Sequence, residues 1–194
     1  LSLYNEDRSQ FYCHLSEQQS LVLHHYREGS PLSLSFWRID MVTLTPAELE
    51  EIHAHLHNYM HTEEAQSMKG FCQHGAVSTY DHVMNVVRLS YYLNKRFRLG
   101  ADMRSLVVGS FLHDFYLYDW HDNDGTHRLH GFTHPQRALS NASRLFALNE
   151  KEQAIIRQHM WPLTFRAIPS CRESLIVCLS DKISSTLETL FQRE

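Results

Sequence analysis

The sequence predicts an all-α protein, built as a single-domain helical bundle around one hydrophobic core. From residue 45 onwards, apolar residues recur at helical spacing in one segment after another, and helix-capping residues separate these segments. The chain shows no alternation of strands with helices, no glycine-rich phosphate-binding loop and no internal repeat. Its 194 residues, 43% of them hydrophobic and 21% charged, are enough for one domain with a sizeable core.

The first 40 residues differ from the rest of the chain. They show no sustained periodicity, and the Arg-Glu-Gly-Ser-Pro sequence at residues 27–31 is a loop signal. We therefore expect residues 1–40 to be an N-terminal extension whose role the sequence does not define. Residues 41–194 are expected to form the functional domain.

Capping residues indicate where the first long helices begin. Thr45 is followed by Pro46 and then by Glu48, which combines an N-cap, a proline at the first helical position and a capping-box glutamate. Ser78, with Asp81 three residues later, is the start signal of another long helix. Both signals precede apolar residues at helical spacing, so two amphipathic helices are expected.

Glycines and apolar runs indicate the limits of the next helices. A short helix over residues 63–69 should stop at Gly70, and the long helix that follows it should end by Gly100. Residues 101–115 are strongly apolar, and we expect them to form a single buried helix.

The last third of the chain combines a polar loop with three more helices. Residues 116–134 are rich in His, Asp, Tyr and Gly, and loops of that length in a compact domain tend to be functional. Pro135 should open the next helix, and Asn149 with Glu152 repeats the capping-box pattern for a helix that reaches residue 159. A final helix is expected over residues 172–191.

The most informative pair of residues is His113-Asp114, which ends the apolar run 106–112. Burying a histidine and a carboxylate in such surroundings is costly unless something compensates both polar groups. A bound metal ion would compensate both of them. The sequence therefore predicts a metal site in the core of the bundle.

Four further residues carry the right chemistry to complete this site. His82 shares a predicted helix face with Val86, and His159 follows two isoleucines at helical spacing. Asp181 ends another apolar run, and His134 stands at the N-terminal entry of a predicted helix. A single inward histidine is more often a hydrogen-bonded core residue than a ligand, but an ordered set across several helices is hard to explain in that way.

The ordered set resembles the HD-domain superfamily of metal-dependent phosphohydrolases, in its six-ligand, two-metal branch. The residues that carry the resemblance are His82, His113, Asp114, His134, His159 and Asp181. The resemblance covers about residues 70–190, and the branch includes diadenosine tetraphosphate hydrolases, cyclic-dinucleotide phosphodiesterases and some di-iron oxygenases. It implies an HD-type helical bundle with the metal site in its core. The chain lacks the Gly-Tyr-Pro signature of the cyclic-dinucleotide enzymes.

The resemblance also implies a role for each ligand. One metal would be bound by His82, His113, Asp114 and Asp181. Asp114 would bridge to a second metal, which His134 and His159 would complete, and a bridging hydroxide would be the catalytic nucleophile.

Other site residues are expected around the metals. Lys182 would meet the substrate phosphate and balance developing charge, with cationic help from Arg128 or Lys69. His130 is the candidate proton donor of the long loop, and His74 is a candidate for lining the substrate pocket. Tyr118 stands where some HD nucleotidases place an acid, so the sequence leaves the identity of the general acid open.

The predicted function is hydrolysis of a phosphate ester or anhydride in a small molecule, with a nucleotide as the expected substrate. Nitrogen and carboxylate ligands without thiolates suit divalent Mn, Fe, Co, Ni, Zn or Mg, and two ions are expected. Two alternatives stay open. One is an HD-type di-iron oxygenase, and the other is a non-catalytic, metal-containing module that senses nucleotides.

Composition narrows the expected partners and location. A formal net charge of −4 argues against a broad nucleic-acid-binding surface. No stretch approaches the roughly 18 apolar residues of a membrane helix, and no signal peptide is visible. The four cysteines form no CxxC motif, which fits a reducing compartment, so a cytoplasmic protein is expected. The oligomeric state stays open, with a homo-oligomer as one option.

Overall fold

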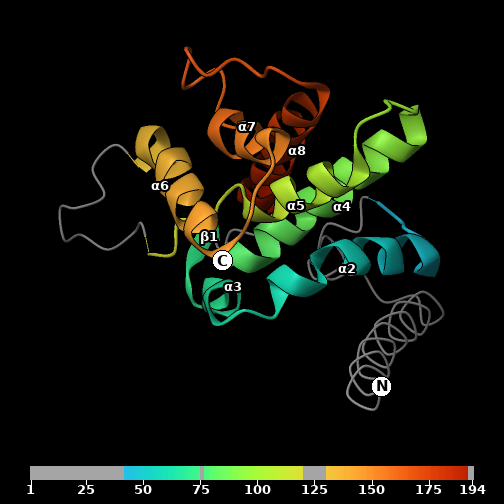
Figure 1. The fold of residues 1–194 in the computed structure, drawn as a ribbon, viewed down its shortest axis with the longest axis horizontal. Coiled ribbons are helices and arrows are strands. Elements are labelled where there is room, and N and C mark those ends of the chain that lie inside the picture. The colour runs from blue at the N-terminus through green and yellow to red at the C-terminus, as the bar shows by residue number, and fades with distance from the viewer. Residues whose placement is uncertain (1–41, 75–76, 120–129, 192–194) are drawn as a thin grey trace. The chain divides into compact units, whose positions relative to one another are not determined.

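The fold was analysed in a computed structural model, which describes residues 42–74, 77–119 and 130–191 (Figure 1). Among these residues the chain forms seven α-helices and one two-stranded sheet, so the prediction of an all-α, single-domain fold is confirmed. The predicted N-terminal extension, residues 1–40, lies outside the described residues. The helices are α2 (Pro46–Met60), α3 (Glu63–Ser67), α4 (Thr79–Phe97), α5 (Met103–Leu112), α6 (His130–Leu145), α7 (Glu150–Gln158) and α8 (Arg172–Phe191).

The helix starts agree with the capping residues of the sequence. The Thr45 hydroxyl accepts a hydrogen bond from the Glu48 backbone N–H at 3.3 Å, and the Glu48 carboxylate accepts one from the Thr45 N–H at 2.7 Å. The same reciprocal pair joins Asn149 and Glu152 at the start of α7. These bonds satisfy backbone donors that the first turn of a helix leaves without partners, so the capping-box predictions are confirmed.

Two helix limits differ from the sequence prediction. The helix expected over residues 101–115 ends at Leu112, because the His113 imidazole donates to the Ser110 carbonyl, which the next helical turn would otherwise use. The helix expected to open at Pro135 begins at His130 instead. Pro135 is therefore inside α6, where it removes the one backbone hydrogen bond that a residue at this position would donate to the carbonyl of Gly131.

A small antiparallel sheet, which the sequence analysis did not predict, precedes α4. It pairs strand β1 (Cys72–His74) with strand β2 (Val77–Ser78) and follows the 3₁₀ turn η2 (Met68–Gly70). Strands of two or three residues are too short to show a period of two in the sequence, which explains why they escaped prediction.

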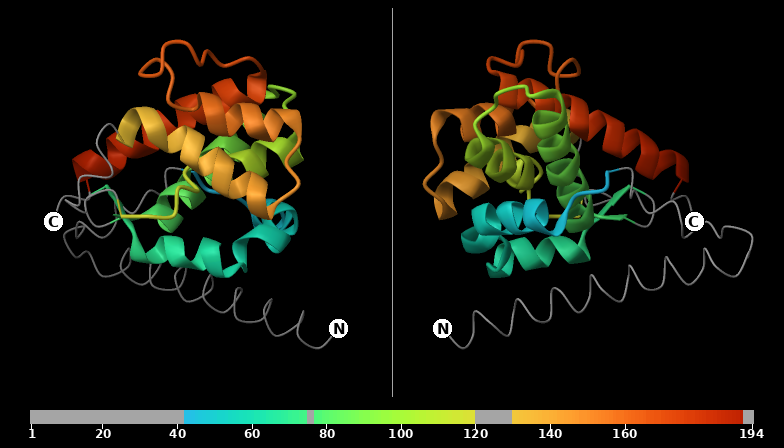
Figure 2. Two further views of the ribbon diagram at one scale, coloured as in Figure 1. Left: turned by 60° about the vertical axis from the view of Figure 1, so that its left-hand side comes forward. Right: turned by 90° about the vertical axis from the view of Figure 1, so that its right-hand side faces the viewer.

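Helices α4 and α5 form the centre of the bundle. They pack against each other, while α8 covers α4 and α7 covers α5. Figures 1 and 2 show α2 and α3 on one side of this central pair and α7 and α8 on the other, with α6 beside α7. The fully buried side chains of Val83 and Val87 from α4, and of Val108 and Phe111 from α5, belong to one core cluster. The candidate metal ligands are carried by this core.

A close contact between helices predicts the effect of one substitution. A Cβ atom added at Gly109 of α5 would lie 3.0 Å from two atoms of the Ile155 side chain on α7. Gly109→Ala is therefore expected to lower the free energy of unfolding by about 1–3 kcal/mol, although alanine is the better helix former. Urea denaturation measures the change. Gly70→Ala is the matched control, because a Cβ there meets nothing within 4 Å, and an equal loss in both variants would contradict the packing argument.

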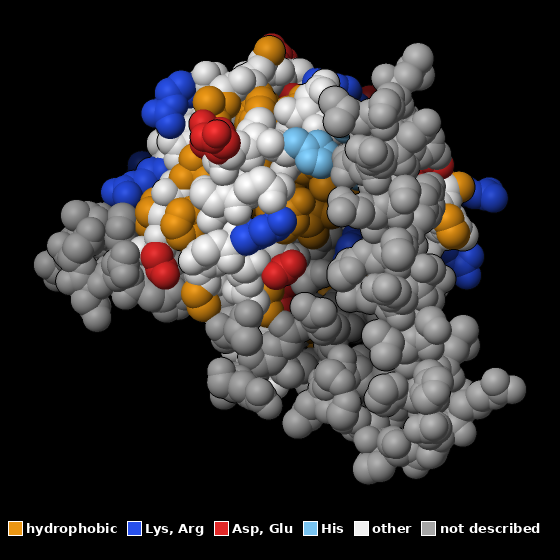
Figure 3. Space-filling model, turned by 90° about the horizontal axis from the view of Figure 1, so that it is seen from below, with side chains coloured by type: hydrophobic (Ala, Val, Ile, Leu, Met, Phe, Trp, Pro, Cys, Tyr) orange, Lys and Arg blue, Asp and Glu red, His pale blue; other side chains and the backbone are white. Residues whose placement is uncertain are grey.

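The surface carries both signs of charge. Figure 3 shows lysines and arginines interspersed with acidic side chains on the described part of one face, which agrees with a formal net charge of only −4. Within the described residues, no helix combines the length and the apolar character that crossing a membrane requires.

Candidate metal centre

Six polar side chains meet inside the bundle, brought there by five different helices. None of the six is more than 7% exposed. They are His82 on α4, His113 and Asp114 directly after α5, His134 on α6, His159 at the end of α7 and Asp181 on α8. The structure thus brings together every residue that the sequence analysis proposed as a metal ligand.

Three of the four histidines are oriented by the helix that carries them. In each case Nδ1 donates to a backbone carbonyl three or four residues earlier in the chain. Because a carbonyl only accepts, Nδ1 carries a proton in each case and Nε2 faces the centre, where Nε2 of His134 and Nε2 of His159 lie 2.8 Å apart. Metal-binding histidines usually show this arrangement. The bonds join His113 to Ser110 (2.6 Å), His134 to His130 (3.0 Å) and His159 to Ile156 (2.9 Å).

The fourth histidine is oriented by a glutamate that the sequence analysis missed. Nδ1 of His82 lies 2.7 Å from a carboxylate oxygen of Glu188, which is fully buried on α8. The other oxygen of Glu188 accepts from the Asn85 amide at 3.0 Å. Glu188 follows Asp181 by seven residues and so shares its helix face, which is the signal that could have found it.

The carboxylate of Asp114 lies between two pairs of histidines. Its Oδ1 is 3.2 Å from Nε2 of His134 and 3.4 Å from Nε2 of His159. Its Oδ2 is 3.5 Å from Nε2 of His113 and 3.8 Å from Nε2 of His82. Each oxygen therefore faces a different pair, which is the geometry a bridging carboxylate requires.

Asp181 lies beside the pair formed by His82 and His113. Its Oδ1 lies 3.3 Å from Nε2 of His82 and 3.8 Å from Nε2 of His113. The cluster contains three overlapping groups of three residues. Within each group, one ligand atom from each residue lies within 4.8 Å of the other two, so each group could hold a metal ion. The groups are His82 with His113 and Asp114, His113 with His159 and Asp181, and Asp114 with His134 and His159.

Some buried polar atoms of the cluster have no hydrogen-bond partner among the described residues. They include Nε2 of His113 and Oδ1 of Asp114, both of which point into the centre. An unsatisfied buried polar group costs about 1–3 kcal/mol, and more when it is charged. A cation between these atoms would compensate both of them, so the donor set fits a metal ion.

The electrostatics of the cluster favour positive charge at its centre. Burial raises the pKa of Asp114 and of Asp181, but the imidazole of His113 beside both carboxyls holds each pKa well below its usual range. Burial lowers the pKa of His82, yet its carboxylate partners, Asp181 first, raise it to about 10. Burial lowers the pKa of His159, which keeps that imidazole neutral and able to bind a metal. A metal ion would replace the protons that the cluster otherwise attracts.

Gln73 is a second residue that the sequence analysis missed. Its amide nitrogen donates to Oδ2 of Asp114 at 2.7 Å, and its amide oxygen accepts from the hydroxyls of Thr79 and Tyr116. These bonds fix the rotation of the Asp114 carboxylate. The neighbouring His74, which was the predicted pocket residue, belongs to β1, and its side chain lies outside the described part of the structure.

Comparisons of the chain with protein-family models, with curated proteins and with solved structures found no match. The likeness to the HD superfamily therefore depends on the order of the six residues in the chain and on the geometry of the cluster. Both are compatible with an HD domain, and the buried group could hold a metal ion.

Lys182, proposed to meet the substrate phosphate, binds backbone carbonyls in the structure. Its ammonium donates to the carbonyl oxygen of His159 at 2.9 Å and to that of Cys178 at 3.3 Å. A cation is favourable at the C-terminal end of α7, where the last carbonyls have no helical partners. Lys182 thus fixes the backbone that carries His159, and its contact with phosphate stays a prediction.

His130, proposed as a proton donor, lies next to the cluster. Its ring stacks on that of His134 with centroids 4.6 Å apart, and its Nδ1 forms a 2.9 Å hydrogen bond with the hydroxyl of Tyr118. The proposed substrate ligand Arg128 and the rest of the loop over residues 120–129 lie outside the described residues. Their contribution to the site stays a prediction.

Proposed function

We propose that this chain is a metal-dependent phosphohydrolase of the HD type. It cleaves a phosphate ester or anhydride of a small molecule, and a nucleotide is the expected substrate. One observation carries the proposal: the two oxygens of Asp114 face two separate pairs of buried histidine nitrogens. A carboxylate shared in this way suits two divalent ions, and paired ions suit the charge of a phosphate group.

The ligands divide into two sets that share Asp114. One ion would be held by His82, His113, Asp181 and Oδ2 of Asp114, and the other by Oδ1 of Asp114 with His134 and His159. When bound, two such ions supply an activated water and stabilise charge on the attacking and leaving oxygens of a phosphate ester. The nitrogen and oxygen donors, without thiolates, suit Mn, Fe, Co, Ni, Zn or Mg.

The protein contributes orientation and proton transfer. Gln73 and Glu188 hold Asp114 and His82 in the rotamers that point their donor atoms inward. Burial of the cluster strengthens every electrostatic interaction within it, because little water is present to screen the charges. His130 lies beside His134 and donates a proton to the departing oxygen, while Tyr118 orients the His130 ring.

Phosphate release tests this function directly. Purified protein is incubated with a panel of nucleotides and dinucleotides in the presence of Mn²⁺, and inorganic phosphate is measured. Release is expected from the wild type, and it should be lost after chelation and in the Asp114→Ala variant. Release that persists in the variant would show that the cluster does not catalyse the reaction.

Failure across the whole panel would favour one of the two alternatives. Iron content with oxygen uptake and no phosphate release would indicate the di-iron oxygenase. Tight nucleotide binding without turnover would indicate a sensing module whose metal is structural.

A further inference from the structure

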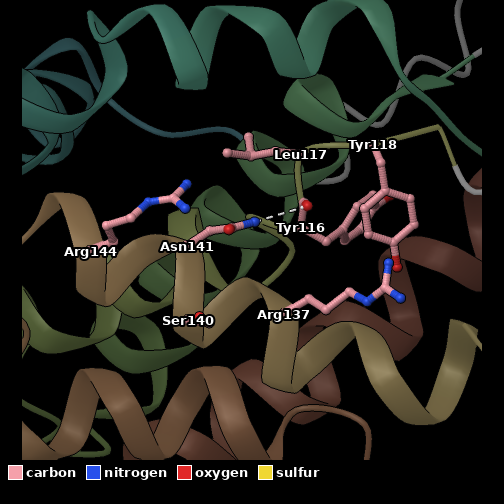
Figure 4. A pocket seen from close by; sticks show the side chains of 7 residues that line it. All are labelled: Tyr116, Leu117, Tyr118, Arg137, Ser140, Asn141 and Arg144. Atoms are coloured by element: carbon pink, nitrogen blue, oxygen red, sulfur yellow. Dashed lines mark hydrogen bonds between the residues drawn. The ribbon is translucent and has the colours of Figure 1, made fainter.

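A pocket of about 350 Å³ lies between α6 and the segment that follows α5 (Figure 4). Residues 116–118 form one wall, and side chains from residues 137–144 of α6 form the other. Its size is within the range of small-molecule sites, about 300–1,000 Å³. Neither the metal ligands nor the proposed proton donor line this pocket, so the mechanism above does not account for it.

The pocket is cationic. Arg137 and Arg144 line it, no acidic residue of the described part of the chain does, and α6 contains no Asp or Glu in its sequence. The two arginines are seven residues apart, which puts them on one helix face and about 10 Å apart along the helix axis. Figure 4 shows their guanidinium groups on either side of Asn141. Arg144 forms no ion pair or hydrogen bond with any described residue, so its charge is not neutralised within that part of the chain.

The wall opposite the arginines is held in place by specific contacts. The Asn141 amide donates to the backbone carbonyl of Tyr116 at 2.9 Å, which ties this segment to α6. Leu117 has a φ of 60°, a left-handed conformation that costs energy for any residue with a Cβ atom. The Arg137 guanidinium lies 5.1 Å from the centre of the Tyr118 ring, a cation–π contact that orients it along the pocket. The pocket is therefore preformed.

The pocket adjoins the metal centre through Tyr116. The Tyr116 ring lies 5.8 Å from that of His134, and its hydroxyl donates to Gln73, which in turn holds Asp114. On α6, Arg137 follows His134 by three residues and so lies on nearly the same face. Tyr116 thus contacts the cluster on one side and lines the pocket on the other, and α6 carries residues of both.

We propose that the Arg137–Arg144 pocket binds a second phosphoryl group of the substrate, so that the enzyme acts on molecules with a chain of phosphoryl groups. Guanidinium groups pair with phosphate oxygens through two parallel hydrogen bonds, which suits arginine to this role. The phosphate-binding property depends only on the pocket. The statement about substrate class rests on the proposed function.

The binding experiment needs no catalysis. Inorganic tripolyphosphate is titrated by calorimetry into chelator-treated wild type and into the Arg137→Ala/Arg144→Ala variant. The variant should bind at least about tenfold more weakly, because charge-assisted hydrogen bonds are lost. The matched control is Arg96→Ala/Arg157→Ala, which removes the same charge from exposed positions on α4 and α7 and should bind as wild type does. Unchanged affinity in the pocket variant, or an equal loss in the control, overturns the proposal.

A kinetic experiment tests the substrate class. With Mn²⁺ present, KM is compared for ATP and for p-nitrophenyl phosphate, which carries only one phosphoryl group. The pocket variant should raise KM for ATP by at least about tenfold and leave that for p-nitrophenyl phosphate unchanged. An equal rise for both substrates overturns the assignment. If the wild type hydrolyses neither substrate, the proposed function fails, while the titration still decides whether the pocket binds phosphate.

Discussion

Replacing Asp114 with asparagine is expected to abolish metal binding at the cluster and, with it, phosphate release. The amide keeps the shape of the carboxylate and one acceptor for Gln73, but its nitrogen has no lone pair for a metal ion. Asp114 belongs to both of the ligand sets proposed above and to two of the three groups that could hold a metal ion, so both sets should weaken together. Metal content measured by elemental analysis should fall to background, and phosphate release should fall by roughly a thousandfold or more.

Asp102→Asn provides the matched control for this variant. Asp102 caps the other end of α5, where its carboxylate accepts from the Ser105 backbone N–H at 2.8 Å, and asparagine caps a helix equally well. The control should keep its metal and its activity. A thermal melt separates ligand loss from misfolding, because a metal at 100 times its Kd stabilises the wild type by about 2.7 kcal/mol and should not stabilise Asp114→Asn. Full metal content in Asp114→Asn would show that the ligand set is wrong.

Replacing Glu188 with glutamine is expected to weaken metal binding about 10- to 100-fold. Glu188 is buried and accepts a hydrogen bond from Nδ1 of His82, so its charge makes the opposite nitrogen, Nε2, a stronger donor to a metal. The neutral amide of glutamine lacks this charge. Its NH₂ group would also face a hydrogen-bond donor, either Nδ1–H of His82 or the amide of Asn85. The measurement is a competition titration with a metal-sensitive dye.

Glu173→Gln controls for the loss of a buried glutamate on the same helix. Glu173 is 1% exposed and accepts from the Asp102 N–H at 2.7 Å and from the Lys151 ammonium at 2.8 Å, without contacting any of the four histidines. Both variants should lose some stability, but only Glu188→Gln should lose metal affinity. Equal affinities in the two variants would mean that Glu188 contributes only to folding.

The helices could be predicted from the sequence because their signals are interactions between residues close together in the chain. A capping residue such as Thr45 or Asn149 acts on backbone groups within three residues, and an amphipathic face repeats every three or four residues. Both signals can be followed along the chain without knowing the fold. Where a local competitor acts unseen, as the His113 imidazole does on the Ser110 carbonyl, the predicted helix limit is wrong by a few residues.

Part of the candidate site can also be read from local sequence patterns. The inward position of His82 and the placement of His113 and Asp114 at the end of an apolar run are readable from sequence, because burial follows from the surrounding apolar residues. The structure brings all six candidate ligands together, and their role in binding metal stays a prediction that the variants above test.

The sequence by itself determined the fold class, the helix starts marked by capping boxes and the order of candidate ligands, all of which depend on residues close together in the chain. Only the tertiary structure decided that Glu188 supports His82, 106 residues away, and that Gln73 holds Asp114, 41 residues away. It alone placed two arginines of α6 opposite Tyr116 and Tyr118. Contacts between distant segments depend on how helices pack, and packing is set by the shape of the whole core, which no local pattern encodes.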